Sequence, residues 1–383
     1  MDFDLQWLLI GLPVVFALGW MASRLDLRQL RRDHRDAPRA YFKGLSLLLS
    51  EQQDKAIDAF IEAVQRDPDT TELHFALGNL FRRRGEFERA VRVHQHLLQR
   101  ADLPAIERHR AQHALAQDFL KAGLFDRAEE AFRSLEGTGY EAEARQALLM
   151  LYERSRDWPR AIQTAQAIEA AGGASLAPRI AHYWCEQAQA ADDRGDTAAA
   201  DEALMRARQA APTGARALVM TGRRLARAGH PTEALAAWDE LRRVQGPSFA
   251  LVAAEYADAA RAAGRADAAR QALQELAESE PGIDVLRALA RLDEGSAGPH
   301  RERLLALLRA QPTLSAALEV LQASPEGADA TTVAVLRQAL STAARPLQRY
   351  RCAACGFEAQ HWFWQCPGCL GWDSYPPRRI EEQ

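Results

Sequence analysis

A repeat of about thirty-four residues constrains the fold of this chain more than any other feature of its sequence. Its clearest mark is a central alanine that returns at near-constant spacing: Ala56, Ala90, Ala128, Ala161, Ala200, Ala234 and Ala269. The intervals are 34, 38, 33, 39, 34 and 35 residues, so the small deviations fit into loops between units. A fixed period of this length is typical of supersecondary units stacked in a row. At 383 residues the chain also exceeds the roughly 250 to 300 residues beyond which one hydrophobic core stops growing.

Each unit carries the signals of two packed helices. A small residue such as Gly44 or Gly78 lets the first helix approach the second closely, and a turn glycine such as Gly85 or Gly229 supplies a positive φ. Prolines mark the ends of second helices: Pro68, Pro212 and Pro281. The pattern resembles the tetratricopeptide repeat, a family of two-helix units that stack into a solenoid with a concave surface.

This resemblance implies an array of about seven units over residues 37–281. Residues 282–345 keep a helical period without the repeat signature, which predicts degenerate or capping helices. The composition agrees with an all-α class, because 48% of the residues are hydrophobic but only 7% are aromatic. The formal net charge of −4 argues against a nucleic-acid-binding protein.

The N-terminus reads as a membrane anchor. Residues 5–22 spell LQWLLIGLPVVFALGWMA, in which Gln6 is the one strongly polar side chain. As a helix this run rises about 27 Å, close to the ~30 Å of a hydrocarbon core. Asp2 and Asp4 precede the run, which is the wrong charge for a cleaved signal peptide. We therefore predict a single transmembrane helix within residues 1–23; the alternative is a buried core helix.

Arginines follow the apolar run closely: Arg24, Arg28, Arg31, Arg32, Arg35 and Arg39. The positive-inside rule then places the N-terminus outside and everything after residue 23 in the cytoplasm, beginning with a basic juxtamembrane segment at residues 24–36. Because the cytoplasm is reducing, clustered cysteines there are expected to hold metal or act in redox chemistry rather than form structural disulfides.

Four of the five cysteines lie near the C-terminus, as Cys352, Cys355, Cys366 and Cys369. The spacing is C-x-x-C, ten residues, then C-P-x-C, which predicts two knuckles around one tetrahedral ion, Fe or Zn. We expect Gly356 and Gly371 to serve the tight turns of the knuckles. The motif resembles a rubredoxin-type knuckle or zinc ribbon, and it defines a metal-binding module at residues 346–383.

The module is too small to hold a core without such a staple. With four thiolates it leaves no coordination position open for hydrolysis. Its aromatic side chains exceed what so short a segment can bury, so we expect some of them to dock on the helical array or on a partner: Phe357, Trp362, Phe363, Trp364 and Trp372.

Other residues with ligating or nucleophilic side chains are expected to have packing or surface roles. His109 and His113 stand four apart on a predicted helix but lack the intervening Glu of a zinc protease motif. His94 and His96 are predicted to face different sides of a helix. Cys185 is interpreted as a small buried hydrophobic residue, and His361 as a loop residue rather than a fifth ligand.

The order of parts, together with local stretches such as LGNLFRRRGEFERAVRVHQ, IAHYWCE, YRCAACGF and WQCPGC, resembles the lipopolysaccharide assembly protein B family of Gram-negative bacteria. The resemblance covers essentially the whole chain and is weakest over residues 283–344. It implies a single-pass protein of the bacterial inner membrane, with its bulk on the cytoplasmic side and Cys352, Cys355, Cys366 and Cys369 as metal ligands.

The resemblance further implies an adaptor that limits lipopolysaccharide synthesis by presenting the deacetylase that commits the cell to lipid A synthesis to a membrane-bound AAA zinc protease. It implies as a third partner an inner-membrane regulator that senses lipopolysaccharide, and it leaves homo-oligomers open. Two other functions stay open: a scaffold for lipopolysaccharide synthesis and export enzymes, and a rubredoxin-type electron carrier. An enzyme is not expected, since the sequence has no phosphate loop, nucleophile motif or acid/base pair.

Overall fold

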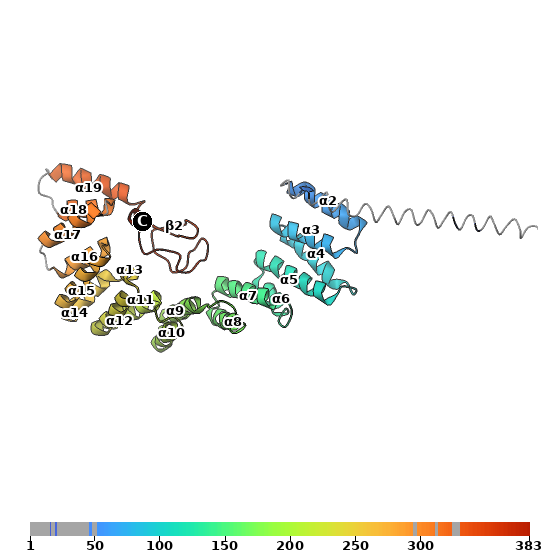
Figure 1. Cartoon of the computed structure of the whole chain (residues 1–383), viewed down its shortest axis with the longest axis horizontal. Helices are drawn as coiled ribbons and strands as arrows, with labels where there is room; N and C mark the ends of the chain where they lie inside the picture. The colour runs from blue at the N-terminus through green and yellow to red at the C-terminus, as the bar shows by residue number, and fades with distance from the viewer. Residues whose placement is uncertain are drawn as a thin grey trace, which may run out of the picture. The chain divides into compact units, whose positions relative to one another are not determined.

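The structure is a computed structural model that describes Phe16, Trp20 and residues 46–47, 52–293, 297–310, 313–323 and 330–383. These residues form a long series of helices that ends in a small module with two short strands (Figure 1). They divide into two compact units, the first ending at Asp157 and the second running from Trp158 to Gln383.

The first unit contains the helices α2 (Gln53–Arg66), α3 (Thr71–Arg84), α4 (Phe87–Gln99), α5 (Ala105–Lys121), α6 (Phe125–Arg133) and α7 (Glu141–Ser155). Consecutive helices pack against each other, as expected of a solenoid whose units contact only their neighbours. Two apolar clusters fill the spaces between them, one around Phe60 and Phe81 and the other around Phe75 and Leu97.

The helices of the second unit are α8 (Trp158–Ala170), α9 (Ala177–Asp193), α10 (Thr197–Ala210), α11 (Ala215–Arg227), α12 (Pro231–Val244), α13 (Gly246–Phe249), α14 (Ala253–Ala262), α15 (Ala266–Ser279), α16 (Ile283–Leu292), α17 (Ala297–Ala310), α18 (Leu314–Ala323) and α19 (Ala330–Ala344). The strands β1 (Tyr350–Arg351) and β2 (Glu358–Ala359) follow. A 3₁₀ turn at Ile380–Glu382 closes the chain.

The small residues of the repeat explain how tightly the paired helices cross. Ala56, Ala90, Ala128, Ala161, Ala200 and Ala234 are all fully buried and Ala269 is 3% exposed. A Cβ atom on Gly222 would lie 2.2 Å from Nε1 of Trp238, and one on Gly78 would lie 2.5 Å from the His94 ring. Each glycine therefore receives a large side chain from the partner helix, which confirms the role predicted for Gly78.

Turn and stop signals also behave as predicted. Gly85 ends α3 with φ of 85°, and the turn glycine Gly229 has φ of 82°. Pro212 and Pro281 lie just beyond the ends of α10 and α15. The all-α solenoid expected from the period is confirmed.

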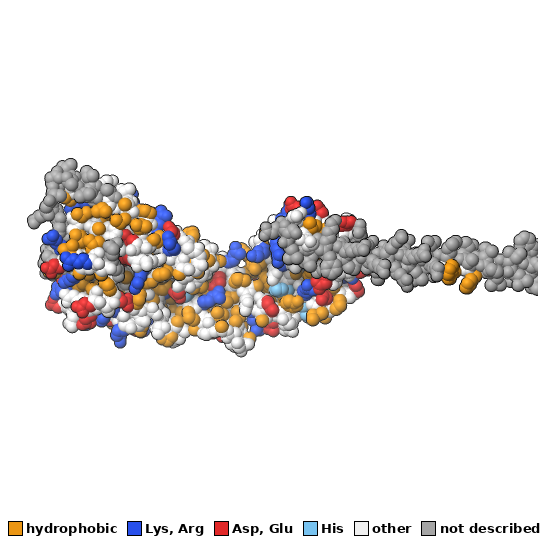
Figure 2. Space-filling model, turned by 45° about the horizontal axis from the view of Figure 1, so that its top comes forward, with side chains coloured by type: hydrophobic (Ala, Val, Ile, Leu, Met, Phe, Trp, Pro, Cys, Tyr) orange, Lys and Arg blue, Asp and Glu red, His pale blue; other side chains and the backbone are white. Residues whose placement is uncertain are grey.

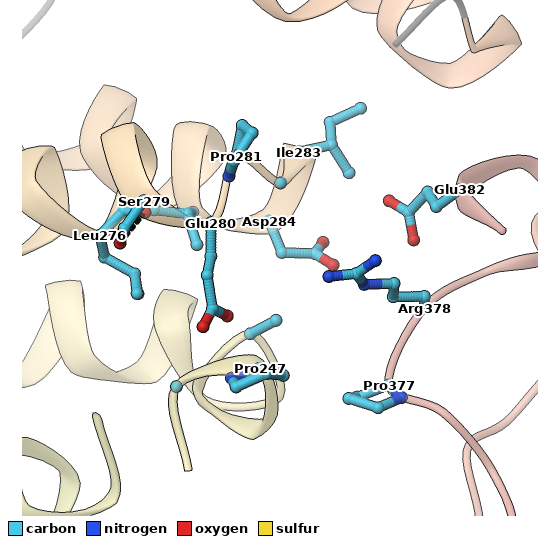
Figure 3. Close-up of a pocket in the computed structure, with 14 residues that line it drawn as sticks. Pro247, Leu276, Ser279, Glu280, Pro281, Ile283, Asp284, Pro377, Arg378 and Glu382 are labelled. Carbon is cyan, nitrogen blue, oxygen red and sulfur yellow. Dashed lines mark hydrogen bonds between the residues drawn. The ribbon is translucent and has the colours of Figure 1, made fainter. Parts of the chain in front are cut away.

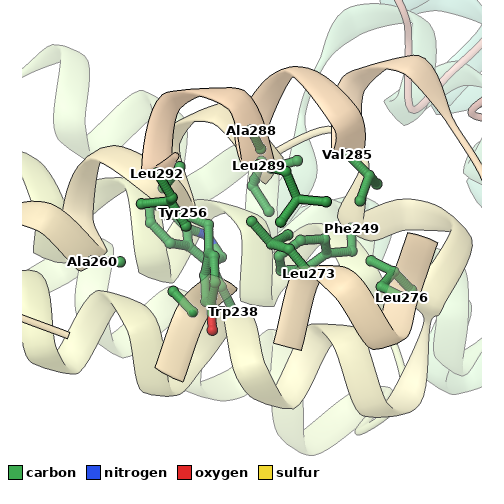
Figure 4. Packing of buried hydrophobic residues seen from close by; sticks show 14 of the residues in the cluster. Trp238, Phe249, Tyr256, Ala260, Leu273, Leu276, Val285, Ala288, Leu289 and Leu292 are labelled. Atoms are coloured by element: carbon green, nitrogen blue, oxygen red, sulfur yellow. The ribbon is translucent and has the colours of Figure 1, made fainter. Parts of the chain in front are cut away.

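A large apolar cluster of the second unit lies among helices α11 to α18 (Figure 4). Trp238 and Phe249 are fully buried within it, and the rings of Phe249 and Tyr256 meet edge to face at 5.1 Å. Because this core includes α16, the apolar packing continues past residue 281 into the segment predicted to be degenerate.

Acidic and basic side chains are interspersed over the face of the molecule drawn in Figure 2. Among the described residues, no helix is both long and apolar enough to cross a membrane. The predicted anchor at residues 1–23, apart from Phe16 and Trp20, and the basic segment at residues 24–36 lie outside the residues that the structure describes.

Candidate metal centre

The first knuckle is the turn between β1 and β2. The strands pair antiparallel, with Tyr350 opposite Ala359 and Arg351 opposite Glu358. The backbone N–H of Gly356 donates to the carbonyl of Cys352 at 2.9 Å, and Gly356 takes φ of 75°. This tight turn brings Cys355 back beside Cys352, as the spacing predicts.

The second knuckle has the same hydrogen bonding but a different turn residue. The N–H of Leu370 donates to the carbonyl of Cys366 at 2.8 Å, and the N–H of Cys366 donates to Gly371 at 2.9 Å. The positive φ, 61°, falls on Leu370 rather than on Gly371, so the turn role predicted for Gly371 is wrong. Leu370 directly follows Cys369, just as Gly356 directly follows Cys355. The two residues therefore occupy equivalent turn positions, which is why the positive φ falls on Leu370 and not on Gly371.

The four sulfur atoms of Cys352, Cys355, Cys366 and Cys369 all lie within 4.8 Å of one another. Sγ of Cys352 is 3.8 Å from that of Cys369, and Sγ of Cys355 is 3.6 Å from that of Cys366. A tetrahedron with metal–sulfur bonds of about 2.3 Å has edges of about 3.8 Å. The arrangement therefore fits one Zn or Fe ion held by four thiolates.

Burial divides the four cysteines into two pairs. Cys352 and Cys366, the first of each knuckle, are buried against Tyr375, whereas Cys355 and Cys369 are exposed. One edge of the sulfur tetrahedron therefore faces solvent and the other faces the interior of the module.

In the first knuckle the pKa values of the two thiols are shifted in opposite directions. The Ser374 hydroxyl, with backbone N–H groups, lowers the pKa of Cys352 to about 6. The Phe357 N–H opposes a rise at Cys355, but burial and the three neighbouring sulfurs raise the pKa of that thiol to about 12. Four negative sulfurs this close need a cation to ionise together, so metal binding must displace protons and weaken as the pH falls.

The module docks on α9 through the loop after the second knuckle. The ring of Trp372 stacks on that of His182 at 4.6 Å and 16°, and meets Tyr183 edge to face at 5.9 Å. Nε2 of His182 and Oδ2 of Asp373 are 2.8 Å apart. Trp158 of α8 also meets Trp372 edge to face, at 6.4 Å.

Two further aromatic residues extend this contact. Trp364 packs on the core of the second unit, and the guanidinium of Arg216 on α11 lies 5.9 Å from its ring centre. Trp362 meets Trp364 edge to face at 4.2 Å and donates from Nε1 to the carbonyl of Tyr375 at 3.1 Å. The prediction that surplus aromatic surface docks on the array is confirmed.

The C-terminal tail makes a second attachment at α16 and α18. Arg379, which is largely buried, pairs with Asp284 at 3.1 Å, and the nearby carboxylates of Asp284 and Glu382 outweigh burial to raise its pKa. The Glu381 carboxylate accepts from the Ser315 N–H at 3.2 Å. A pocket of ≈ 130 Å³ lies between the tail and the turn before α16, with Glu280, Asp284 and Arg378 among its lining residues (Figure 3).

Replacing Arg379 with alanine should loosen the tail attachment by about 1–2 kcal/mol, since a partly buried, hydrogen-bonded ion pair with Asp284 is lost. Limited proteolysis of residues 346–383 measures the change as faster cleavage. Arg351→Ala is the matched control, because the Arg351–Glu358 pair is more exposed and should contribute less than about 1 kcal/mol. Equal cleavage rates for both variants would contradict the prediction.

The remaining candidate residues have packing or surface roles in the structure. The ring of His113 stacks on Tyr140 at 5.1 Å. His94 is buried while His96 is exposed, so the two face different sides as predicted. Cys185 is 1% exposed and burial raises the pKa of its thiol to about 12, which suits the predicted apolar role.

Two arrangements were not anticipated from the sequence. In the first unit, fully buried Asp118 pairs with His94 at 2.5 Å and with Arg82 at 2.8 Å. In the second, His182 and Ser374 connect the array to a cysteine sulfur. The sequence signal for the helical members of both groups is a polar residue at a position that the helical period assigns to the interior, whereas Asp373 and Ser374 lie in a loop and have no such signal.

Family models match both parts of this architecture. A tetratricopeptide repeat model matches residues 43–101, 113–175 and 219–282, and a rubredoxin metal binding domain model matches residues 350–376. Fold and site together define a tetratricopeptide-repeat protein with a C-terminal four-cysteine metal-binding module.

Curated relatives narrow this class. Lipopolysaccharide assembly protein B of Escherichia coli K12 is 33% identical over 386 residues, covering 98% of each chain. The protein of the same name from Haemophilus influenzae Rd is 26% identical over 398 residues, covering 99% of each. The chain belongs to the lipopolysaccharide assembly protein B family.

Among solved structures, a tetratricopeptide repeat protein from Parabacteroides merdae matches 80% of this chain and 98% of its own at 16% identity and a TM-score of 0.33.

Proposed function

We propose that this protein is a non-enzymatic adaptor of the bacterial inner membrane that regulates lipopolysaccharide synthesis. The supporting observation is 33% identity to lipopolysaccharide assembly protein B over 98% of both chains, module included. In this proposal residues 1–23 anchor the chain and residues 24–36 lie against the cytoplasmic surface. Residues 37–281 form the binding array, and residues 282–345 cap it. The bulk of the protein lies on the cytoplasmic side.

The adaptor acts by bringing two proteins together. The array binds the deacetylase that commits the cell to lipid A synthesis, and the anchor confines the complex beside the membrane AAA zinc protease. Confinement raises the effective concentration of substrate at the protease without adding a contact to either protein. A lipopolysaccharide-sensing membrane protein opposes the process through the anchor and juxtamembrane segment.

The module in this proposal has a structural role. Cys352, Cys355, Cys366 and Cys369 hold one Fe or Zn ion, which cross-links the two knuckles when bound. With four thiolates as ligands, no position is left for water or substrate. What the module then provides is a fixed surface, because Trp372 and Arg379 attach it to helices far apart in the sequence.

One observation favours a second function, electron transfer. Cys355 and Cys369 are exposed, so an ion at this site would have an edge open to solvent. This function requires iron with a reversible one-electron couple. Metal analysis of protein purified without added metal tests it: zinc at full occupancy would eliminate electron transfer and leave the adaptor function untouched.

The adaptor proposal is tested by the lifetime of the deacetylase in cells after protein synthesis is blocked. Deleting the gene should lengthen that lifetime several-fold, and the full-length chain should restore it. A chain lacking residues 1–23 should not restore it, although its array and module are intact. If that soluble chain restores normal turnover, confinement at the membrane is not the mechanism.

A further inference from the structure

Three consecutive residues connect the metal site to the helical array. Trp372 and Asp373 contact His182 on α9, and Ser374 contacts a cysteine sulfur. Asp373, which contacts the array, and Ser374, which contacts the cysteine sulfur, are adjacent in the chain. A movement of Asp373 therefore also moves Ser374.

Ser374 is the residue on the metal side. Its Oγ lies 3.3 Å from Sγ of Cys352, and its hydroxyl also lies 3.0 Å from the carbonyl of Gly371. When Cys352 is a thiolate, the single hydroxyl proton has two acceptors, of which the charged sulfur is the stronger. Gly371 does not lose its only donor, because the N–H of Cys366 donates to the same carbonyl at 2.9 Å. The hydroxyl is therefore free to stabilise the charged sulfur.

His182 is the residue on the array side. Its side chain is only 7% exposed, and its ring both stacks on Trp372 and lies within hydrogen-bond distance of Asp373. Asp373 has φ of 51°, in the left-handed region, which is uncommon for residues other than glycine although Asp adopts it more readily than most. A backbone in that region persists only where its surroundings hold it. The bonds that hold Asp373 are the His182 contact and its own N–H, which donates to the carbonyl of Trp364 at 2.9 Å.

We infer that His182 and Asp373 are positioning residues that set the Ser374 hydroxyl against Cys352, so that docking on the array strengthens the hold of the site on its metal. Binding linkage is reciprocal, so the bound metal strengthens docking on α9 by the same factor. The inference goes beyond the proposed function, because it concerns metal affinity and does not depend on any partner protein.

The tail attachment provides the control. Arg379 binds Asp284 and holds the module on α16, but neither side chain forms a hydrogen bond with a cysteine sulfur. Arg379→Ala therefore weakens docking without removing the Ser374 hydroxyl or its support at Asp373. A purely mechanical attachment would respond alike to the loss of either contact. Positioning of Ser374, in contrast, depends on the His182 contact and not on the Arg379 contact.

The experiment uses the full-length protein in detergent, loaded with Co²⁺ or with Zn²⁺. The energy of the sulfur-to-cobalt charge-transfer band reports hydrogen bonding to the thiolates, and transfer of zinc to a chromophoric chelator reports affinity. Ser374→Ala should move the band to longer wavelength and weaken zinc binding about 10–100-fold, the usual effect of losing an outer-shell partner. Ser374→Thr keeps the hydroxyl and should restore both.

His182→Ala should shift the band in the same direction as Ser374→Ala, and the double variant should show little more than Ser374→Ala alone. Arg379→Ala should leave the band where it is. An unmoved band in Ser374→Ala would overturn the role of the hydroxyl. The role of the array would be overturned if the band of His182→Ala did not move. It would also be overturned if the band of Arg379→Ala moved as far as that of His182→Ala. A Ser374→Ala protein that fails to bind metal while Ser374→Thr binds normally supports the inference.

Discussion

Replacing Cys366 and Cys369 together with serine is expected to unfold the C-terminal module and release it from α9 and α16. The two strands are only two residues each and the core around the knuckles is small, so we expect the metal to contribute much of the stability of the module. Structural zinc sites in small domains contribute roughly 10–16 kcal/mol of binding free energy at neutral pH. Trp364 and Trp372 should then enter water, which red-shifts their fluorescence, and residues 346–383 should become sensitive to protease.

Cys185→Ala is the matched control for this experiment. Cys185 lies on α9, is buried, and is not one of the four clustered cysteines. Its replacement should leave metal content and tryptophan emission unchanged. A double serine variant that keeps its module protease-resistant would show that the metal is dispensable for the fold. If it also left deacetylase turnover unchanged, the metal would have no part in the proposed function.

The second large effect is expected at Gly222. Alanine at an exposed helix position is usually better than glycine by about 1 kcal/mol. At Gly222 we expect the opposite sign, a loss of about 3 kcal/mol, because the new Cβ would lie 2.2 Å from a tryptophan that is fully buried. Denaturant unfolding followed by circular dichroism measures the change.

Two further variants test the cause of the Gly222 effect. Gly282→Ala, also in the second unit, places its Cβ in open space and should cost less than about 1 kcal/mol. Combining Gly222→Ala with Trp238→Leu should cost less than the sum of the two single changes, since the smaller side chain makes room. Additive losses would show that the clash with Trp238 is not the reason.

What the sequence predicts well are features that depend on near neighbours in the chain. The close approach of α3 and α4 at Gly78 lies within one hairpin, so the recurring small residue is enough to predict it. The four cysteines are likewise close in sequence, and their spacing predicts that the sulfurs meet. The positive φ of Leu370 was not predicted from the sequence, because a bulky residue rarely adopts one. The spacing of the cysteines nevertheless places Leu370 and Gly356 at equivalent positions, directly after the second cysteine of each knuckle.

What the sequence does not predict are contacts between distant segments. His182 and Asp373 are 191 residues apart, and no periodic pattern links them. The buried Asp118 group is also hidden, because it joins side chains of α3, α4 and α5 whose facing depends on the crossing of the helices. The helical period predicts which face of its own helix a residue lies on. The side chain that it contacts on another helix depends on how the helices stack.

The attachment of the module at both α9 and α16 has a consequence for the order of folding. Hairpins such as α11–α12 form from local contacts, which are fast because little chain entropy is lost in closing short loops. The contacts at His182 and Asp284 involve Asp373 and Arg379, which are synthesised after α19 and therefore after both docking helices. Docking through these residues therefore follows synthesis of the hairpins, and a chain truncated before residue 372 lacks both contacts. The attached module thus distinguishes chains that carry these residues from shorter fragments whose helices have already formed.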